Sequence, residues 1–363
     1  MHQVFQTDVA GKRLAVETGY IAQQADGSVL CRYGETVVLV TATASKEPRE
    51  GIDFFPLLVD YEEKLYAVGK IPGGFIKREG RPGEAAILAA RQIDRPIRPL
   101  FPDGFRNDVQ VVATVFSVEP GIDPALLAMN GASIALSISD IPFDGPIAGV
   151  SVGLVDGKFV INPGVEESEQ SMLSLTVAGT EDAVLMVEAG ANEVPEEQVL
   201  EAIMYGHETI KEIVAFQKKI IAQVGVAKKE FEGFKPDPQI EQKVKDYAYD
   251  KLNEAVRNPD KLAREELTDA VRDDVLAHFA EIMGEDVPVR DINNVLEALL
   301  KQIVRRMITQ EGTRPDGRAL DEVRKVTCDV GLLPRVHGSA MFRRGQTQVI
   351  TACTLGAIGE EQI

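Results

Sequence analysis

Over the first 225 residues, apolar residues gather in short runs rich in β-branched side chains. Clusters of Gly, Pro and Asp bound these runs, which is the pattern of strands joined by turns. Helical periodicity appears twice among them. The predicted strands cover Val37–Ala42, Val109–Val118, Ile147–Val155 and Leu173–Val177, and the predicted helices cover Gly83–Asp94 and Glu196–Ile221. The pattern therefore predicts an α/β domain over residues 1–225.

The pattern changes after this domain. Residues 226–238 have the charge and Pro content of a linker, and from 239 to 310 apolar residues recur at helical spacing. This predicts a small all-helical domain, in which we find no residues arranged for chemistry. In the first domain, we expect the helix that starts at Gly83 to end near Arg95, because Pro96 disfavours helical geometry in the residue before it. The clearest apolar stripe of the helical domain is Ile292, Val295, Leu296, Leu299, Leu300, Ile303, Val304 and Met307.

A segment near the start of the chain recurs near its end. GSVLCRYGETVVLVTAT, residues 27–43, aligns with GSAMFRRGQTQVITACT, residues 338–354, at an offset of 311, and Gly19 matches Gly331 with one further residue of gap. The shared glycines at turn positions predict the same β-hairpin built twice. Because the first copy and its helices take about 225 residues, residues 311–363 hold only the start of a second α/β domain. About fifty residues bury little apolar surface, so we expect the chain after about Arg314 to be frayed or packed on the first domain.

Composition excludes several classes of protein. The chain has 363 residues, 44% of them hydrophobic, and no apolar run long enough to span a membrane. Its longest uncharged stretch, Pro124 to Ser139, is predicted to be a buried core segment. The N-terminus lacks the apolar region of an export signal. Three scattered cysteines fit a reducing, cytoplasmic location and argue against a disulfide framework and a zinc site.

Charge is unevenly distributed along this acidic chain. The formal net charge is −18, yet nine Lys and Arg face four acids between Lys64 and Arg106, so this window carries +5 and the rest −23. A local basic region in an acidic protein is what a focused polyanion site requires. Charge alone also allows a chance cluster on a solvated face.

The centre of this window has residues suited to single-stranded nucleic acid. Gly73 and Gly74 predict a mobile loop, and Phe75 is followed closely by the cations Lys77, Arg78 and Arg81. An aromatic ring stacks on bases while the cations follow the phosphates.

Three arginines follow this loop on the predicted helix. Arg91 and Arg95 would lie on one face and form a phosphate clamp, with Arg98 beyond them. The alternative is that ordinary salt bridges to Asp94, Glu84 or Glu79 occupy them.

Common catalytic and metal-binding motifs are absent. The chain has no phosphate-binding P-loop, no HExxH, no GxSxG and no dinucleotide-binding glycine pattern. The four histidines are far apart and lack metal-ligand spacing.

Three stretches together resemble the bacterial polynucleotide phosphorylase family: FIKREGRP, ARQIDRPIRPLFP and RPDGR followed by RVHGSAMFRRGQTQV. The resemblance runs over the whole chain. It implies two RNase PH-like domains with the α/β fold of ribosomal protein S5 domain 2, joined by an all-helical domain. It also implies a cytoplasmic homotrimer that degrades mRNA from 3′ to 5′ by phosphorolysis, with Mg²⁺, with phosphate as co-substrate and with other RNA-degradation proteins as partners.

The resemblance assigns RNA-binding residues one by one. The family's aromatic-basic loop, usually Phe-Phe-Arg-Arg, reads Phe75-Ile76-Lys77-Arg78 here, so one stacking ring is lost and one arginine is a lysine, which weakens bidentate phosphate binding. The RNA contacts that it implies are Phe75, Lys77, Arg78, Arg91, Arg95 and Arg318.

The family's catalytic groups and Mg²⁺ ligands belong to the second RNase PH-like domain and fall beyond residue 363, so we expect no catalytic or metal-binding residue here. In the first domain, Asp123, Pro124 and Ala125 stand where the family's phosphate loop has serines. A carboxylate repels phosphate, Pro lacks an N–H donor and Ala lacks a hydroxyl, so this copy should be catalytically silent.

The sequence thus favours part of a phosphorolytic 3′–5′ exoribonuclease, whose role is to supply RNA-channel contacts and a trimer scaffold. One alternative is a catalytically inactive fragment for RNA binding or oligomerisation. Another is a scaffold of α/β and helical modules without RNA contact.

Overall fold

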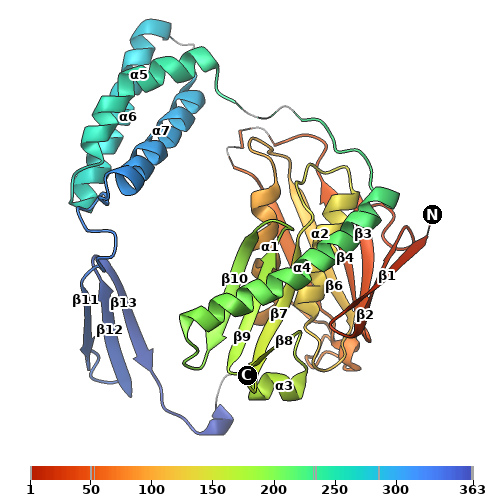
Figure 1. Cartoon of the computed structure of the whole chain (residues 1–363). Helices are drawn as coiled ribbons and strands as arrows, with labels where there is room; N and C mark the ends of the chain where they lie inside the picture. The colour runs from red at the N-terminus through yellow and green to blue at the C-terminus, as the bar shows by residue number, and fades with distance from the viewer. Residues whose placement is uncertain are drawn as a thin grey trace. The chain divides into compact units, whose positions relative to one another are not determined.

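The computed structural model describes residues 2–49, 51–52, 54–231, 233, 235–284 and 287–360. The chain forms two compact units, residues 1–234 and 235–363, and each is described by itself. Figure 1 follows the chain through both. Among the described residues, no helix is long and apolar enough to cross a membrane.

Two sheets make up the frame of the first unit. The six-stranded sheet has the order β1-β2-β3-β4-β6-β5, antiparallel except where β5 pairs with β6, and the four-stranded antiparallel sheet has the order β10-β9-β7-β8. The strands of the first sheet are β1 Gln3–Val9, β2 Lys12–Thr18, β3 Gly27–Tyr33, β4 Thr36–Ala44, β5 Leu57–Glu63 and β6 Val109–Ser117. Those of the second are β7 Ala148–Val155, β8 Lys158–Ile161, β9 Leu173–Gly179 and β10 Val184–Ala191.

Helix α2, Pro124–Ile138, is the centre of the first unit and contacts β3, β4, β7, α1 and α4. All of its residues after Pro124 are buried, as predicted for this uncharged stretch. Its one amide side chain replaces a strand neighbour: Asn130 accepts from the Gly149 N–H and donates to the Gly149 carbonyl, both at 3.0 Å. Because both polar groups of the amide are hydrogen-bonded, Asn130 avoids most of the desolvation penalty of a buried polar side chain. The other helices are α1 Glu84–Ile97, α3 Val165–Gln170 and α4 Glu196–Val224, with 3₁₀ turns η1 Leu65–Val68 and η2 Arg98–Leu100.

The expectation that the first helix ends near Arg95 is wrong. Helix α1 continues through Pro96 to Ile97. Pro96 lies in the last turn and is buried, so the helix loses only the hydrogen bond that its missing N–H would have made, and packing of the ring compensates.

The helical part of the second unit consists of α5 Pro238–Ala255, α6 Lys261–Met283 and α7 Val289–Gln310. Asp237 and Asp260 cap α5 and α6 by accepting backbone N–H groups. The stripe predicted on α7 is confirmed, since Ile292, Val295, Leu299 and Ile303 are buried in one cluster with residues of α5 and α6.

The two copies of the predicted repeat have the same structure. Strands β11 Val326–Val330, β12 Gly338–Arg344 and β13 Thr347–Cys353 form a three-stranded antiparallel sheet. In β3–β4 Gly27 faces Ala42, and in β12–β13 Gly338 faces Cys353, which is the same register at an offset of 311. The turn glycines Gly34 and Gly345 share the left-handed region, with φ of 57° and 62°. A short 3₁₀ turn, η4 Ile358–Glu360, follows.

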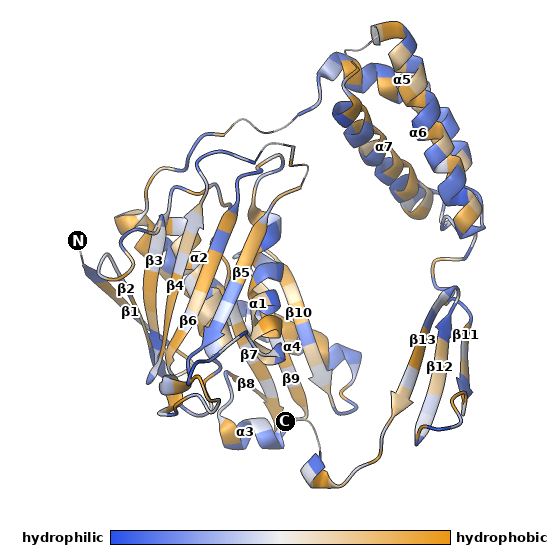
Figure 2. Cartoon of the chain, turned by 180° about the vertical axis from the view of Figure 1, so that it is seen from behind, coloured by the Kyte–Doolittle hydropathy of each residue, from blue (hydrophilic) through white to orange (hydrophobic). Residues whose placement is uncertain are grey.

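The two copies differ in what covers them. Val38 is fully buried in the first copy, whereas its counterpart Val349 is 52% exposed. Figure 2 colours the residues of both sheets by hydropathy. The fraying predicted after Arg314 is wrong, because strands β11–β13 are regularly paired. Hydrogen bonds between neighbouring strands are local and form without a covering helix.

Candidate nucleic-acid interface

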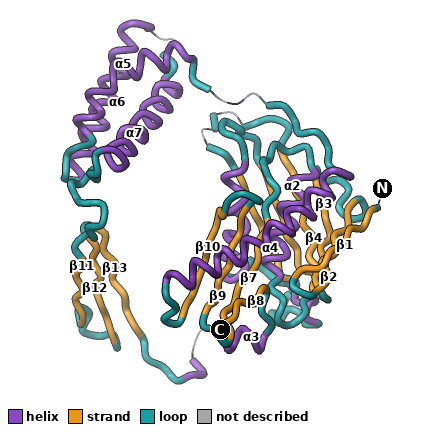
Figure 3. Tube along the Cα trace, in the orientation of Figure 1, coloured by secondary structure: helices purple, strands orange, loops and turns teal. Residues whose placement is uncertain are grey.

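The glycine-rich loop that the sequence singled out links η1 to α1, and all of its residues except Pro72 are exposed. Figure 3 draws the loops of the chain in teal. This loop leaves η1 at Gly69, which has φ 69°, and turns again where the Lys77 N–H donates to the Gly74 carbonyl at 3.1 Å. Lys77 itself has φ 52°, in the left-handed region that few residues other than glycine adopt. Phe75 is completely exposed, at 101%. The loop therefore presents an uncovered aromatic ring next to cations.

The cations of this loop have no acidic partners in the described part of the chain. Among the described residues, no side-chain hydrogen bond or ion pair involves Lys70, Lys77, Arg78 or Arg81. By contrast, Lys64 before the loop forms an ion pair with Glu62, and that contact raises its pKa. Cations that no carboxylate neutralises remain available for phosphates.

The three arginines of α1 have different surroundings. Arg91 is exposed and has no ion-pair partner among the described residues. Arg95, one turn later, donates to Glu188 of β10 at 2.8 Å. Arg98 bonds Asp94 through two nitrogens and also donates to the Leu57 carbonyl at 3.0 Å. The salt-bridge alternative thus holds for Arg98, which pairs with the predicted Asp94 and ties the end of α1 to β5. Arg95 is also paired, but with Glu188, which is not one of the predicted partners.

Arg318 belongs to the second unit, whereas the loop belongs to the first. Its side chain is 12% exposed and is bound within its own turn, donating to Asp316 at 2.8 Å and to the Glu322 carbonyl at 3.0 Å. Burial works to raise the pKa of Asp316, but hydrogen bonds from Arg318 outweigh it and the pKa is lowered. Arg318 therefore stabilises this turn.

Sequence reasoning missed two cations on the helical part. Lys301 and Arg305 lie four residues apart on α7, are exposed, and have no ion-pair partner among the described residues. They flank a shallow apolar groove that includes Leu300, Val304 and Ile308. The i, i+4 spacing of two cations was the available signal, but the apolar stripe beside it was read as core alone.

The segment predicted to be silent begins at the N-terminus of α2. Asp123 caps this helix, and its carboxylate accepts the Ala125 N–H at 2.8 Å. The carboxylate thus stands where an anion would approach the helix N-terminus. Among the described residues, no group of three or more His, Cys, Asp or Glu side chains is placed to hold a metal ion.

Family models match most of the chain. The model described as "3′ exoribonuclease family, domain 1" matches residues 10–142 and residues 322–362, which contain the two copies of the hairpin. Domain 2 of the same family matches residues 145–209. The model described as "Polyribonucleotide nucleotidyltransferase, RNA binding domain" matches residues 239–319, the helical part.

Curated relatives agree with these models. The chain is 60% identical to a polyribonucleotide nucleotidyltransferase of Heliobacterium modesticaldum, 59% to that of Syntrophomonas wolfei and 57% to that of Bacillus licheniformis, each over 99% of this chain and 51% of the relative. It therefore spans about half the length of the curated relatives that it matches. The crystal structure of rice (Oryza sativa) Rrp46 matches with a TM-score of 0.46 and 14% identity, over 61% of this chain and 94% of that one. The family matches confirm the RNase PH-like α/β fold and the family that the sequence motifs resemble. The chain belongs to the polyribonucleotide nucleotidyltransferase family of 3′ exoribonucleases.

Proposed function

We propose that this chain provides the RNA-guiding part of an enzyme that degrades RNA from 3′ to 5′ by phosphorolysis and releases nucleoside diphosphates. The observation that carries the proposal is the exposed loop, where Phe75 stands beside Lys77 and Arg78 and neither cation has a partner among the described residues. The names of its relatives and the family descriptions support this reaction class.

The loop and the start of α1 fit single-stranded RNA by their chemistry. Phe75 offers a ring on which any base can stack, because every base has a π-face. Lys77, Arg78 and Arg91 would neutralise successive phosphates without reading sequence. Such a grip holds a strand and lets it slide, which a processive exonuclease requires.

We also propose roles for the remaining cations. Arg95 would bind a phosphate by exchanging its contact with Glu188, and Arg318 would position the turn that holds it rather than bind RNA directly. Lys301 and Arg305 on α7 would give the helical part its RNA contact, in keeping with the description of its family model.

Phosphate and Mg²⁺ would act in the whole enzyme, Mg²⁺ by stabilising charge on the transferred phosphoryl group. The described residues do not fit the metal, since no ligand cluster is present among them, and Asp123 disfavours phosphate at α2. No step of the reaction is therefore assigned to residues of this chain. The same proposal includes the domain bounds 1–225 and 239–310, assembly as a homotrimer, a cytoplasmic location, and other RNA-degradation proteins as partners.

Fluorescence anisotropy with labelled oligo(A) tests the binding role directly. The chain should bind the single strand more tightly than a duplex of equal length, because a duplex hides its base faces from Phe75. Equal binding of both, or no binding at 50 mM salt, would contradict the proposal. Light scattering of the same sample reports whether the chain forms trimers.

A further inference from the structure

A cavity of about 460 Å³ lies inside the first unit, away from the exposed loop. Its walls come from β1, β2, β3, α2, β7, α3 and α4, so they connect both sheets, and no residue of the loop or of α1 lines it. This volume is within the range of pockets that bind small molecules. Neither the family descriptions nor the proposed function gives it a role.

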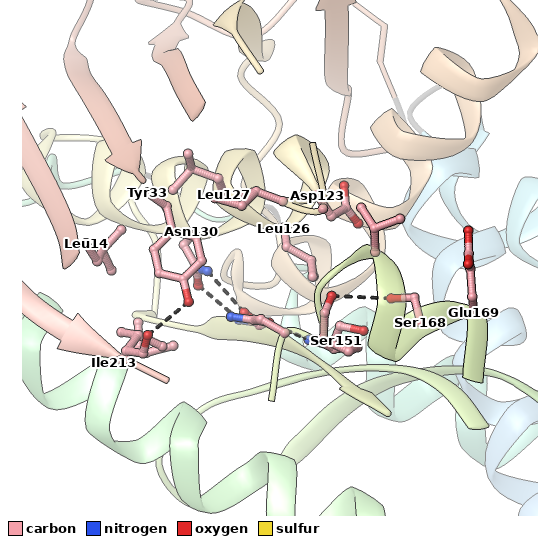
Figure 4. A pocket seen from close by; sticks show the side chains of 17 residues that line it. Leu14, Tyr33, Asp123, Leu126, Leu127, Asn130, Ser151, Ser168, Glu169 and Ile213 are labelled. Carbon is pink, nitrogen blue, oxygen red and sulfur yellow. Dashed lines mark hydrogen bonds between the residues drawn. The ribbon is translucent and has the colours of Figure 1, made fainter. Parts of the chain in front are cut away.

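The two ends of the cavity differ in polarity. Figure 4 shows Leu14, Tyr33 and Ile213 at one end and Glu169 at the other. The first end is buried and apolar, and its one hydroxyl, that of Tyr33, already donates to the Val9 carbonyl at 2.9 Å. The second end opens to solvent and carries the carboxylates of Asp123 and Glu169 together with Ser168. The cavity is therefore amphipathic along its length.

The charge of this cavity is entirely negative. No Lys, Arg or His is among the residues that line it. Burial raises the pKa of Asp123, and the charge of Glu63 adds to the effect against the lowering by the N–H groups of Ala125 and Leu126. Asp123 is accessible to solvent and yet desolvated, as expected for a side chain on the wall of a concave pocket. Such a carboxylate repels anions and gains from a cation at short range.

We propose that the cavity binds a small organic cation, whose protonated amine contacts Asp123 and Glu169 and whose apolar body fills the end formed by Leu14, Tyr33 and Ile213. A bare metal ion fits less well, because three ligand side chains do not converge there among the described residues. The ligand needs an apolar part to bury against the closed end and a positive charge to pair with the carboxylates at the open end.

Occupancy would stabilise the first unit. A ligand that contacts α2, β7 and α3 together binds the folded state alone, so it raises the thermal midpoint by mass action. The ligand would act as a stabiliser or regulator of the module, separately from RNA at the loop.

Three matched probes test the proposal by isothermal titration calorimetry on the full chain. These are 2-phenylethylamine, its neutral isostere 2-phenylethanol and the anion 3-phenylpropanoate. The amine should bind at least tenfold more tightly than the alcohol, and the anion should bind most weakly. The proposal is overturned if the alcohol binds with the same affinity as the amine, if the anion binds more tightly than the amine, or if the amine does not bind at millimolar concentration.

Variants locate the binding. Asp123→Asn with Glu169→Gln should bring the amine and the alcohol within threefold of each other, while Asn still caps α2. Glu166→Gln, a charge change on the same helix α3 outside the cavity lining, should leave the preference intact. Val165→Trp at the exposed rim should weaken all three probes by blocking the entrance. A preference that survives the double variant, or that the control abolishes, places the amine elsewhere and refutes the assignment.

Discussion

Removing the two adjacent cations of the exposed loop should change how RNA binding depends on salt. Lys77 and Arg78 are exposed, so Lys77→Ala with Arg78→Ala removes no side-chain hydrogen bond or ion pair among the described residues. Each phosphate contact on a single strand contributes about 0.7 to the slope of log K against log salt. Losing two contacts should therefore reduce the magnitude of the slope by about 1.4. Between 50 and 200 mM salt, the unchanged chain should lose roughly sevenfold more affinity than the variant.

Phe75→Ala should have a different signature. Stacking of a base on an aromatic ring contributes about 1–3 kcal/mol, which corresponds to a loss of roughly 5- to 150-fold in affinity. Since no ion is released by stacking, this loss should be similar at every salt concentration, and the slope should stay unchanged. The ring is wholly exposed, so the thermal midpoint should not move.

The assay is fluorescence anisotropy with labelled oligo(A) at 50, 100 and 200 mM salt. Arg13→Ala with Lys158→Ala is the matched control, because it also removes two exposed cations without ion-pair partners among the described residues, on β2 and β8. A slope that Lys77→Ala with Arg78→Ala leaves unchanged would refute the role of the loop. A control pair with the same effect would show that only net charge matters.

Three further predictions concern the fold and the silent site. Gly27→Ala places a Cβ 2.1 Å from the Ala135 carbonyl oxygen and should lower the free energy of unfolding by about 1–3 kcal/mol, measured by chemical denaturation. In the repeat partner, the Cβ of Gly338→Ala meets no atom closer than 3.4 Å, so this variant should lower it by under ~0.5 kcal/mol. Equal losses would contradict the difference in packing between the two copies. Burial raises the pKa of Asp123 in the folded state above its ordinary 3.8, so the protein loses stability as pH rises through that raised value. The Tm of Asp123→Asn should therefore exceed that of the unchanged chain by a margin that grows from pH 4 towards pH 7. A difference in Tm that does not depend on pH would contradict this prediction. With poly(A), phosphate and Mg²⁺, the chain alone should release no nucleoside diphosphate that chromatography can detect. The reason is that Asp123 repels phosphate and that no metal-ligand cluster is present among the described residues. Measurable release would show that the first copy is active.

Local patterns were enough to predict much of the architecture. Strands β4, β6, β7 and β9 lie where runs of β-branched residues between turn clusters placed them. Helices α1, α4 and α7 lie where apolar residues recur at helical spacing, because each buries one face. The repeat predicted the same hairpin built twice, and β3–β4 and β12–β13 share one register at the offset of 311, since turn glycines and strand alternation are local properties. Helix α2 was recognised only as buried, because a helix that is covered on all sides has no periodicity.

The candidate binding residues show the limit of such patterns. Spacing identified the loop around Phe75 and the arginines of α1, but it could not separate Arg91, which has no ion-pair partner in the described part of the chain, from Arg98, which is held by Asp94. An ion pair depends on which distant strand lies beside the helix, and here β10 brings Glu188 to Arg95.

Neighbours along the chain were therefore enough to predict several strands and helices, the duplication, the family and the position of the basic loop. The fold was needed to show which cations lack partners in the described part of the chain, that α1 passes through Pro96, and that β3–β4 packs against α2 while β12–β13 is exposed. It also created the cavity beside Asp123, whose walls come from residues between Val9 and Ile213. Burial, pairing and cavities arise between segments far apart in sequence, so no local pattern records them.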